Sequence, residues 1–208
     1  MLGVILSGGE STRMGRDKGL IIAHNQTWVG SAMEKMAALG IPVVVSINAR
    51  QLPEYTQLLA NEQRNPGEGL IPGKGLLAGD RLIPDNPALT LKGPLAGILS
   101  VHLQFPTEDL FVLACDLPLM DPTLLKDLYL RHQQSNAQAY LYTNAEGPEP
   151  LCGIYTTAGL ARIIHRYRTG ELARHSMKYA LDQLTVDSRP IPEDKKQCFQ
   201  NFNYPNAS

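Results

Sequence analysis

Short runs of apolar and β-branched residues alternate along this chain with segments of helical period. Three runs, at residues 3–6, 42–47 and 110–114, have the length of buried strands. Between the first two, segment 27–39 carries apolar side chains at helical spacing and Gly40 follows it, as expected of a helix and its stop. Strands that alternate with helices pair in parallel, because each helix carries the chain back across the sheet. The alternation predicts an α/β protein with a Rossmann-like three-layer α/β/α arrangement and a mostly parallel sheet.

The rest of the chain continues this pattern with one interruption. Further expected elements are strands at 139–143 and 151–155, a weak strand at 81–83, and helices at 53–60, 95–103, 122–133, 158–167 and 171–184. Gly and Pro are dense within residues 61–92, so we expect an irregular insertion there, and an irregular tail from residue 191 onward. No repeat, low-complexity tract or linker divides the sequence, and a single domain is therefore expected over residues 1–208.

Composition narrows the class of protein. With 43% hydrophobic residues, 19% charged residues and a net charge of -1, the chain is expected to be soluble and globular. A surface that binds nucleic acid needs clustered Lys and Arg to displace counterions. The near-neutral net charge argues against such a surface. The first apolar run is too short for a membrane span or a signal segment. Three cysteines in no metal-like spacing indicate neither a disulfide framework nor a zinc site, so a reducing cytoplasm is the expected location.

Directly behind the first predicted strand, residues 6–18 read LSGGESTRMGRDK. A Gly-rich turn after a strand exposes backbone N–H groups to which a phosphate can bind. The glycine spacing is not that of the dinucleotide fingerprint, and GLIPGKG at 69–75 does not fit the other common phosphate-binding loop. Arg13, Arg16 and Lys18 repel one another unless an anion or a carboxylate neutralises them. The loop therefore predicts a polyphosphate-binding site, and a solvated charged loop is the alternative.

The same loop resembles the signature of the molybdenum cofactor guanylyltransferases, which is usually written with Ala where this chain has Ser7. Four more matches follow in the family's order, GPLAGI at 93–98, CDLP at 115–118, EPLCGIY at 149–155 and NFNYP at 201–205. The resemblance implies a Mg²⁺-dependent nucleotidyltransferase that transfers GMP from GTP to the terminal phosphate of molybdopterin, or of its molybdenum form. The products are then the guanine dinucleotide cofactor and pyrophosphate.

The resemblance also assigns catalytic parts to three residues. Lys18 and Arg13 are expected to contact the triphosphate, although Lys18 could be a surface lysine and Arg13 could pair with Asp17. Asp116 follows the most clearly buried strand and is expected to bind Mg²⁺, because open α/β sheets bind ligands at the carboxyl ends of their strands. A turn cap before Pro118 is the alternative for Asp116. By composition alone, Asp80, Asp85 and Asp121 are rival carboxylates for the metal.

The family match places two binding regions along the chain. The expected nucleotide-binding residues are Leu6, Ser7, Gly8, Gly9, Lys18, Ser46, Asn48, Asp85, Gly93 and Asp116. Asp85 suits guanine, because a carboxylate can accept from N1–H and the 2-amino group together, although it could be a plain turn residue between two prolines. Arg174, Asn201 and Asn203 are expected to bind molybdopterin, and these three rest on the resemblance alone.

Two segments depart from the family pattern. Residues 24–28 read HNQTW where a Gly-Lys-Pro-like turn is common, and the insertion at 67–79 has no counterpart, so a lid and a partner contact both remain open for it. The competing interpretations are a cytidylyltransferase, a sugar-phosphate nucleotidyltransferase and a non-catalytic nucleotide-binding protein. Retention of Lys18 and Asp116 favours an enzyme. Expected partners are GTP, molybdopterin and other cofactor-biosynthesis proteins or acceptor molybdoenzymes, with no nucleic acid or membrane, and a monomer is expected.

Overall fold

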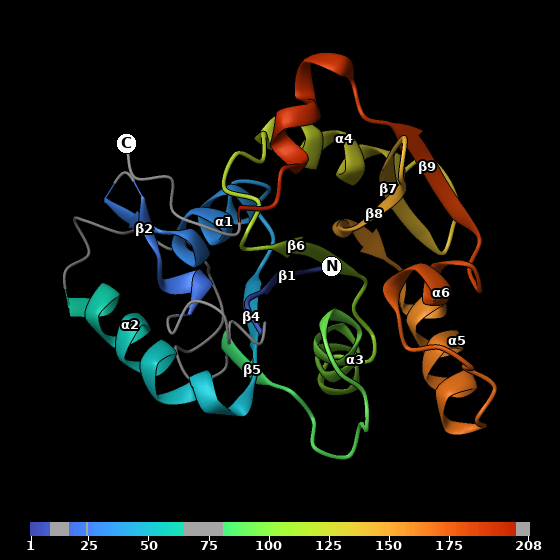
Figure 1. Cartoon of the computed structure of the whole chain (residues 1–208), viewed down its shortest axis with the longest axis horizontal. Coiled ribbons are helices and arrows are strands. Elements are labelled where there is room, and N and C mark those ends of the chain that lie inside the picture. The colour runs from blue at the N-terminus through green and yellow to red at the C-terminus, as the bar shows by residue number, and fades with distance from the viewer. Residues whose placement is uncertain (9–16, 24, 65–80, 203–208) are drawn as a thin grey trace.

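A seven-stranded sheet runs through the whole molecule (Figure 1). The computed structural model describes residues 1–8, 17–23, 25–64 and 81–202, with only the backbone of 61–64. In spatial order the strands are β5 (Leu82–Pro84), β4 (Val43–Ile47), β1 (Leu2–Leu6), β6 (Leu110–Ala114), β8 (Gly147–Tyr155), β7 (Ala139–Asn144) and β9 (Val186–Pro190). Neighbouring strands are parallel except where β8 pairs with β6 and with β7. The predicted mostly parallel sheet is therefore confirmed.

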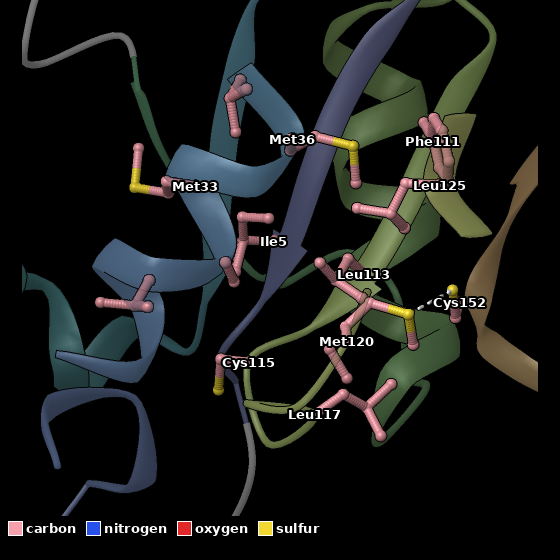
Figure 2. Close-up of a cluster of buried hydrophobic side chains, with 14 of the residues drawn as sticks. Ile5, Met33, Met36, Phe111, Leu113, Cys115, Leu117, Met120, Leu125 and Cys152 are labelled. Atoms are coloured by element: carbon pink, nitrogen blue, oxygen red, sulfur yellow. Dashed lines mark hydrogen bonds between the residues drawn. The ribbon is translucent and has the colours of Figure 1, made fainter. Parts of the chain in front are cut away.

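Helices cover both faces of this sheet. One face carries α1 (Trp28–Ala37), α2 (Leu52–Arg64), α4 (Pro122–His132) and the short 3₁₀ helix η4 (Glu193–Phe199); the other carries α3 (Pro94–Gln104), α5 (Thr157–Arg168) and α6 (Met177–Leu181). Successive strand residues point to opposite faces, so Ile5 packs with the first group of helices and Val4 with the second. Figure 2 shows Ile5 and Leu113 of the sheet against Met33, Met36 and Leu125 of the first group. The three-layer prediction is confirmed.

The helices begin where the sequence supplies capping groups. The hydroxyls of Thr27 and Thr156 accept from backbone N–H groups at the starts of α1 and α5, and the Asp121 carboxylate does the same at α4. Pro94 and Pro122 occupy the first turns of α3 and α4, where a missing N–H costs nothing. Local chemistry therefore fixes most helix boundaries within a few residues of those predicted.

The helix predicted over 171–184 is wrong in length. After α5, Gly170 adopts a left-handed φ of 73° and the N–H of Leu172 bonds back to the carbonyl of Arg166, so the chain turns before it can continue as a helix. Only α6 remains, capped by the Ser176 hydroxyl. The apolar residues Leu172 and Met177 are nevertheless buried, which explains the helical pattern in the sequence.

Several short or exposed elements were not predicted. The edge strand β9 is largely exposed and reads VDSRP, which lacks the apolar run of a buried strand. The hairpin of β2 (Ile22–Ala23) and β3 (Gln26–Thr27) is too short to give a period, and η4 falls within the tail expected to be irregular. Strand β9 is held by pairing with β7, and η4 by packing into the core, rather than by local pattern.

The sheet opens at the carboxyl ends of its parallel strands. The register places Leu6 of β1 beside Ser46 of β4 on one side and Ala114 of β6 on the other. From β1 the chain passes to β4 on one side, and it later returns to β6 on the other, so the connections diverge at β1. Open α/β sheets bind their ligands at such a divergence, outside the carboxyl ends of the strands.

Candidate active site

A cleft of about 640 Å³ lies at this divergence. Every predicted nucleotide-binding residue that the structure describes lines it, namely Leu6, Ser7, Gly8, Lys18, Ser46, Asn48, Asp85, Gly93 and Asp116. They come from the ends of β1, β4 and β6, from the segment after β5, from the start of α3 and, for Lys18, from the 3₁₀ helix η1 (Lys18–Leu20). Gly9, Arg13 and Asn203 lie outside the described residues. The cleft therefore brings together groups that are far apart in the sequence.

Lys18 and Asp116 face each other across one end of this cleft. Lys18 begins the 3₁₀ helix η1 (Lys18–Leu20), Asp116 follows β6, and Lys18 Nζ lies 3.9 Å from Asp116 Oδ2. Burial raises the pKa of the Asp116 carboxyl, and the positive charge of Lys18 opposes that rise. Asp116 Oδ1 is buried without a hydrogen-bond partner among the described residues. This atom is thus available to a cation or donor that enters the cleft.

Asp17 organises the backbone in front of Lys18. Its Oδ1 accepts from the N–H of Gly19 at 2.9 Å, which caps η1, and from the Tyr55 hydroxyl at 2.9 Å. Its Oδ2 accepts from the side-chain amide of Gln51. The loop-organising role fits Asp17 better than a direct phosphate contact, because both carboxylate oxygens already have protein donors.

The opposite end of the cleft contains Asp85. Its backbone N–H donates to the carbonyl of Ile47 at 2.9 Å, which fixes the segment after β5 against the end of β4. Burial raises the pKa of the Asp85 carboxyl. Arg50 and Lys92 also line the cleft, and neither forms an ion pair with another described residue. No motif in the sequence indicated these two cations, although Lys92 directly precedes the GPLAGI motif and Arg50 lies two residues after Asn48.

Two glycines shape the wall formed by α3. Gly93 precedes the helix with a left-handed φ of 72°, a conformation that strains any residue with a side chain. At Gly97 a Cβ would lie 2.5 Å from Ser46 Oγ, so only glycine lets α3 approach β4 this closely. In the GPLAGI motif, Gly93 therefore permits the turn into α3, and Gly97 permits the close packing of α3 on β4 beside the cleft.

The structure describes two of the three carboxylates that the sequence offered as alternatives to Asp116 for the metal, Asp85 and Asp121. Asp121 caps α4 and pairs with Lys195 at 2.5 Å, which lowers the pKa of Asp121 to about 2. It does not line the cleft. Asp80 lies outside the described residues. Of the described rivals, only Asp85 shares the cleft with Asp116, at its other end.

Of the residues predicted to bind molybdopterin, the two that the structure describes do not line the cleft. Arg174 is exposed between α5 and α6, and Asn201 is exposed near the end of the described chain. The tail nevertheless returns to the site, because the N–H of Phe202 donates to the carbonyl of Asp116 at 3.0 Å and the Phe202 ring packs edge-on against Trp28. Asn201 is thereby held beside the segment that carries Asp116, whereas no contact in the described structure links Arg174 to the cleft.

Sequence reasoning missed the polar residues beneath the cleft. Gln51 and Tyr55 are buried at 8% and 1% exposure and contact Asp17, yet Tyr55 has the spacing of an ordinary core residue in α2. Cys115 is a buried thiol, as expected, and burial raises its pKa to about 12, so the thiol stays protonated. The three cysteines form no disulfide.

Together these features define an α/β nucleotide-binding class of protein, with a lysine and a carboxylate facing each other at the carboxyl edge of a mostly parallel sheet. The family model of the MobA-like NTP transferase domain matches residues 3–185, and the chain belongs to that family. In the part of the chain that the structure describes, no helix has the length and apolar character of a membrane span.

Two similar proteins carry the same name. A molybdenum cofactor guanylyltransferase of Pseudomonas entomophila is 29% identical over 97% of this chain and 93% of its own length. One of Serratia proteamaculans is also 29% identical, over 97% of this chain and 88% of its own length. The crystal structure of molybdopterin-guanine dinucleotide biosynthesis protein A from Archaeoglobus fulgidus has a TM-score of 0.68, with 21% identity over 99% of this chain and 93% of that one. This structural match supports the shared fold.

Proposed function

We propose that this protein transfers GMP from GTP to the terminal phosphate of molybdopterin, or of its molybdenum form, to give the guanine dinucleotide cofactor and pyrophosphate. The observation that carries the proposal is the approach of Lys18 Nζ to within 3.9 Å of Asp116 in a cleft lined by the motif residues. Membership in the NTP transferase family and the names of the two relatives support it.

The chemistry requires positioned charge more than a base. A phosphate oxygen of molybdopterin forms a bond to the α-phosphorus of GTP, and the bond from that phosphorus to the bridging oxygen breaks. The electron pair leaves with pyrophosphate. Because the attacking phosphate is already an anion, the protein has to bring two anions together and to stabilise the leaving group. Lys18 supplies that positive charge in the cleft, and we assign Arg13 the same task.

The donor set at Asp116 fits Mg²⁺. This ion usually takes one or two carboxylates, with water and substrate phosphates completing its shell. Asp116 Oδ1 has no partner among the described residues, and those residues contain no group of three metal-ligating side chains. Asp116 would therefore hold the ion together with the substrate phosphates. When bound, Mg²⁺ would neutralise negative charge on the reacting phosphates.

Base recognition is assigned to the other end of the cleft. The Asp85 carboxylate can accept from guanine N1–H and the 2-amino group, whereas cytosine does not offer that pair of donors. For molybdopterin, Asn201 and Asn203 would supply amide groups that both donate and accept, and Arg174 would meet the phosphate. The bond from Phe202 to Asp116 supports the adjacent Asn201 more strongly than Arg174.

The direct test is a turnover assay with purified protein, molybdopterin, Mg²⁺ and α-labelled GTP or CTP. We expect the guanine dinucleotide and pyrophosphate in equal amounts, with little product from CTP. A clear preference for CTP would instead identify a cytidylyltransferase, and nucleotide binding without turnover would identify a non-catalytic binding protein. Sugar 1-phosphates in place of molybdopterin test the remaining enzyme class.

The proposal extends to the location and oligomeric state of the protein. We assign the protein to the cytoplasm, as a monomer, where acceptor molybdoenzymes or other cofactor-biosynthesis proteins would receive its product. Light scattering at assay concentrations tests the monomer, and a stable dimer would contradict it.

A further inference from the structure

A continuous line of buried side-chain hydrogen bonds runs beneath the Lys18–Asp116 end of the cleft. Cys115 Sγ lies 3.4 Å from Ser7 Oγ, Ser7 Oγ lies 2.5 Å from the Tyr55 hydroxyl, and that hydroxyl lies 2.9 Å from Asp17 Oδ1. Ser7, Tyr55 and Cys115 are each less than 9% exposed. The line thus joins the residues that follow β6 and β1, together with α2, to the segment that carries Lys18.

The hydrogens of this line point in one direction. Burial raises the pKa of Tyr55, so its hydroxyl stays protonated and can donate. Because Tyr55 donates to Asp17, its oxygen accepts from the Ser7 hydroxyl, and the Ser7 oxygen accepts from the thiol of Cys115. Every donor is therefore used, and the line ends on a carboxylate, which makes its last bond a charge-assisted one.

Gln51 ties the same segments together a second time. Its Nε2 donates to the carbonyl of Ser7 at 2.9 Å and to the carboxylate of Asp17, and its Oε1 accepts from the N–H of Asn48 at 2.7 Å. Both amide hydrogens and the amide oxygen thus have partners. The residue connects the ends of β1 and β4 with the turn before Lys18.

The line and the ion pair form a closed ring. One end of the line is Asp17, the residue before Lys18, and the other is Cys115, the residue before Asp116. Lys18 and Asp116 then meet at 3.9 Å across the cleft. Apolar side chains of the same size could fill the space without placing hydroxyl, thiol and amide groups out of water. A ring of directed contacts instead restricts how far Lys18 can move relative to Asp116.

We propose that Tyr55 and Gln51 are positioning residues for nucleotidyl transfer, which act by holding Lys18 opposite Asp116. Ser7 stands where the family motif usually has Ala, and in this chain it extends the Tyr55 contact to Cys115, the residue before Asp116. The inference rests on the proposed function, because it assigns these residues to the step that Lys18 and Asp116 serve.

The first experiment compares Tyr55→Phe with a matched control. Removing the hydroxyl leaves the ring in place, and we expect kcat to fall about tenfold with little change in the KM for GTP, since a misplaced group costs rate more than binding. Tyr142→Phe is the control, because Tyr142 is also buried and donates to a carboxylate, Asp127, at 2.6 Å outside the cleft. Equal loss of kcat in the two variants would overturn the proposal.

A double-mutant cycle separates positioning from general stability. In a Lys18→Met background, Tyr55→Phe should lower kcat by less than about twofold, because the residue it positions is gone. Additive losses would show that Tyr55 does not act through Lys18. Gln51→Met, which keeps the side-chain volume, gives a second and independent cycle with the same expectation should Tyr55→Phe fold poorly.

The same cycle remains informative if the proposed reaction is wrong. When the wild type gives no nucleotidyl product, calorimetry with GTP and Mg²⁺ replaces turnover, and the coupling between Lys18 and Tyr55 is measured in Kd. Coupling between Lys18 and Tyr55 without turnover would reject the proposed function and retain the positioning role. Turnover without that coupling would retain the proposed function and reject the positioning role.

Discussion

The two ends of the cleft differ in how many of their polar groups have partners within the protein. At one end, Asp17 accepts from Gly19, Tyr55 and Gln51, and Lys18 lies against Asp116. At the other end, the side chain of Asp85 forms no hydrogen bond or ion pair with the described residues, although burial raises its pKa. Groups around a reacting bond gain from being fixed in advance, whereas groups that recognise a ligand need free donors and acceptors.

Changing Asp116 should have the largest effect. In Asp116→Asn we expect kcat/KM for GTP to fall by about 10³-fold or more, because the variant loses the charge that would bind Mg²⁺. Steady-state pyrophosphate release measures this. Asp121→Asn is the control, since Asp121 caps α4 away from the cleft, and it should affect stability more than rate. Wild-type turnover in Asp116→Asn would remove the metal assignment.

Lys18→Ala is expected to rank second. The loss of one cation at the leaving phosphates should lower kcat by about 10²- to 10³-fold. Circular dichroism and thermal melting should stay near wild type, because the Lys18 side chain is partly exposed. Lys126→Ala, on the exposed side of α4, is the matched control for loss of a lysine. If pyrophosphate release is unchanged in Lys18→Ala, Lys18 has no catalytic role.

A smaller change is expected at the Asp85 end. Asp85→Asn should raise the Kd for GTP about tenfold and leave the weak binding of CTP unchanged, because an amide cannot accept from both guanine donors. Competition calorimetry with the two nucleotides measures the ratio. Equal weakening of GTP and CTP would mean that Asp85 shapes the cleft without recognising the base.

The smallest expected effect is a dependence of GTP affinity on pH. Burial raises the pKa of Asp85, so the carboxyl gains a proton at a higher pH than an ordinary aspartate does. Protonation removes acceptor capacity, and the affinity for GTP should therefore weaken as the pH falls through this raised value. Asp85→Asn should lack that component, which separates it from titration of GTP itself. Identical pH profiles for the two proteins would contradict the assignment.

The sequence predicted the parts of the site that depend on local pattern. The apolar runs located β1, β4 and β6. Because these neighbouring strands are parallel, the residues that follow them lie at the same edge of the sheet. Gln51 and Tyr55 were missed because their role depends on contacts with Asp17, 34 and 38 residues away in the chain. Nothing local distinguishes a buried tyrosine in a helix from one that donates to a carboxylate. For the same reason β9, which depends on pairing with β7, left no signal.

The bond from the Phe202 N–H to the Asp116 carbonyl has a consequence for how the protein is made. A ribosome synthesises the strands and loops of the nucleotide-binding half well before it reaches this residue. The backbone of the turn that carries Asp116 thus acquires one of its partners only after a segment far along the chain has been synthesised. A chain that stops before Phe202 contains Lys18, Asp85 and Asp116, but it lacks the N–H group that donates to the Asp116 carbonyl.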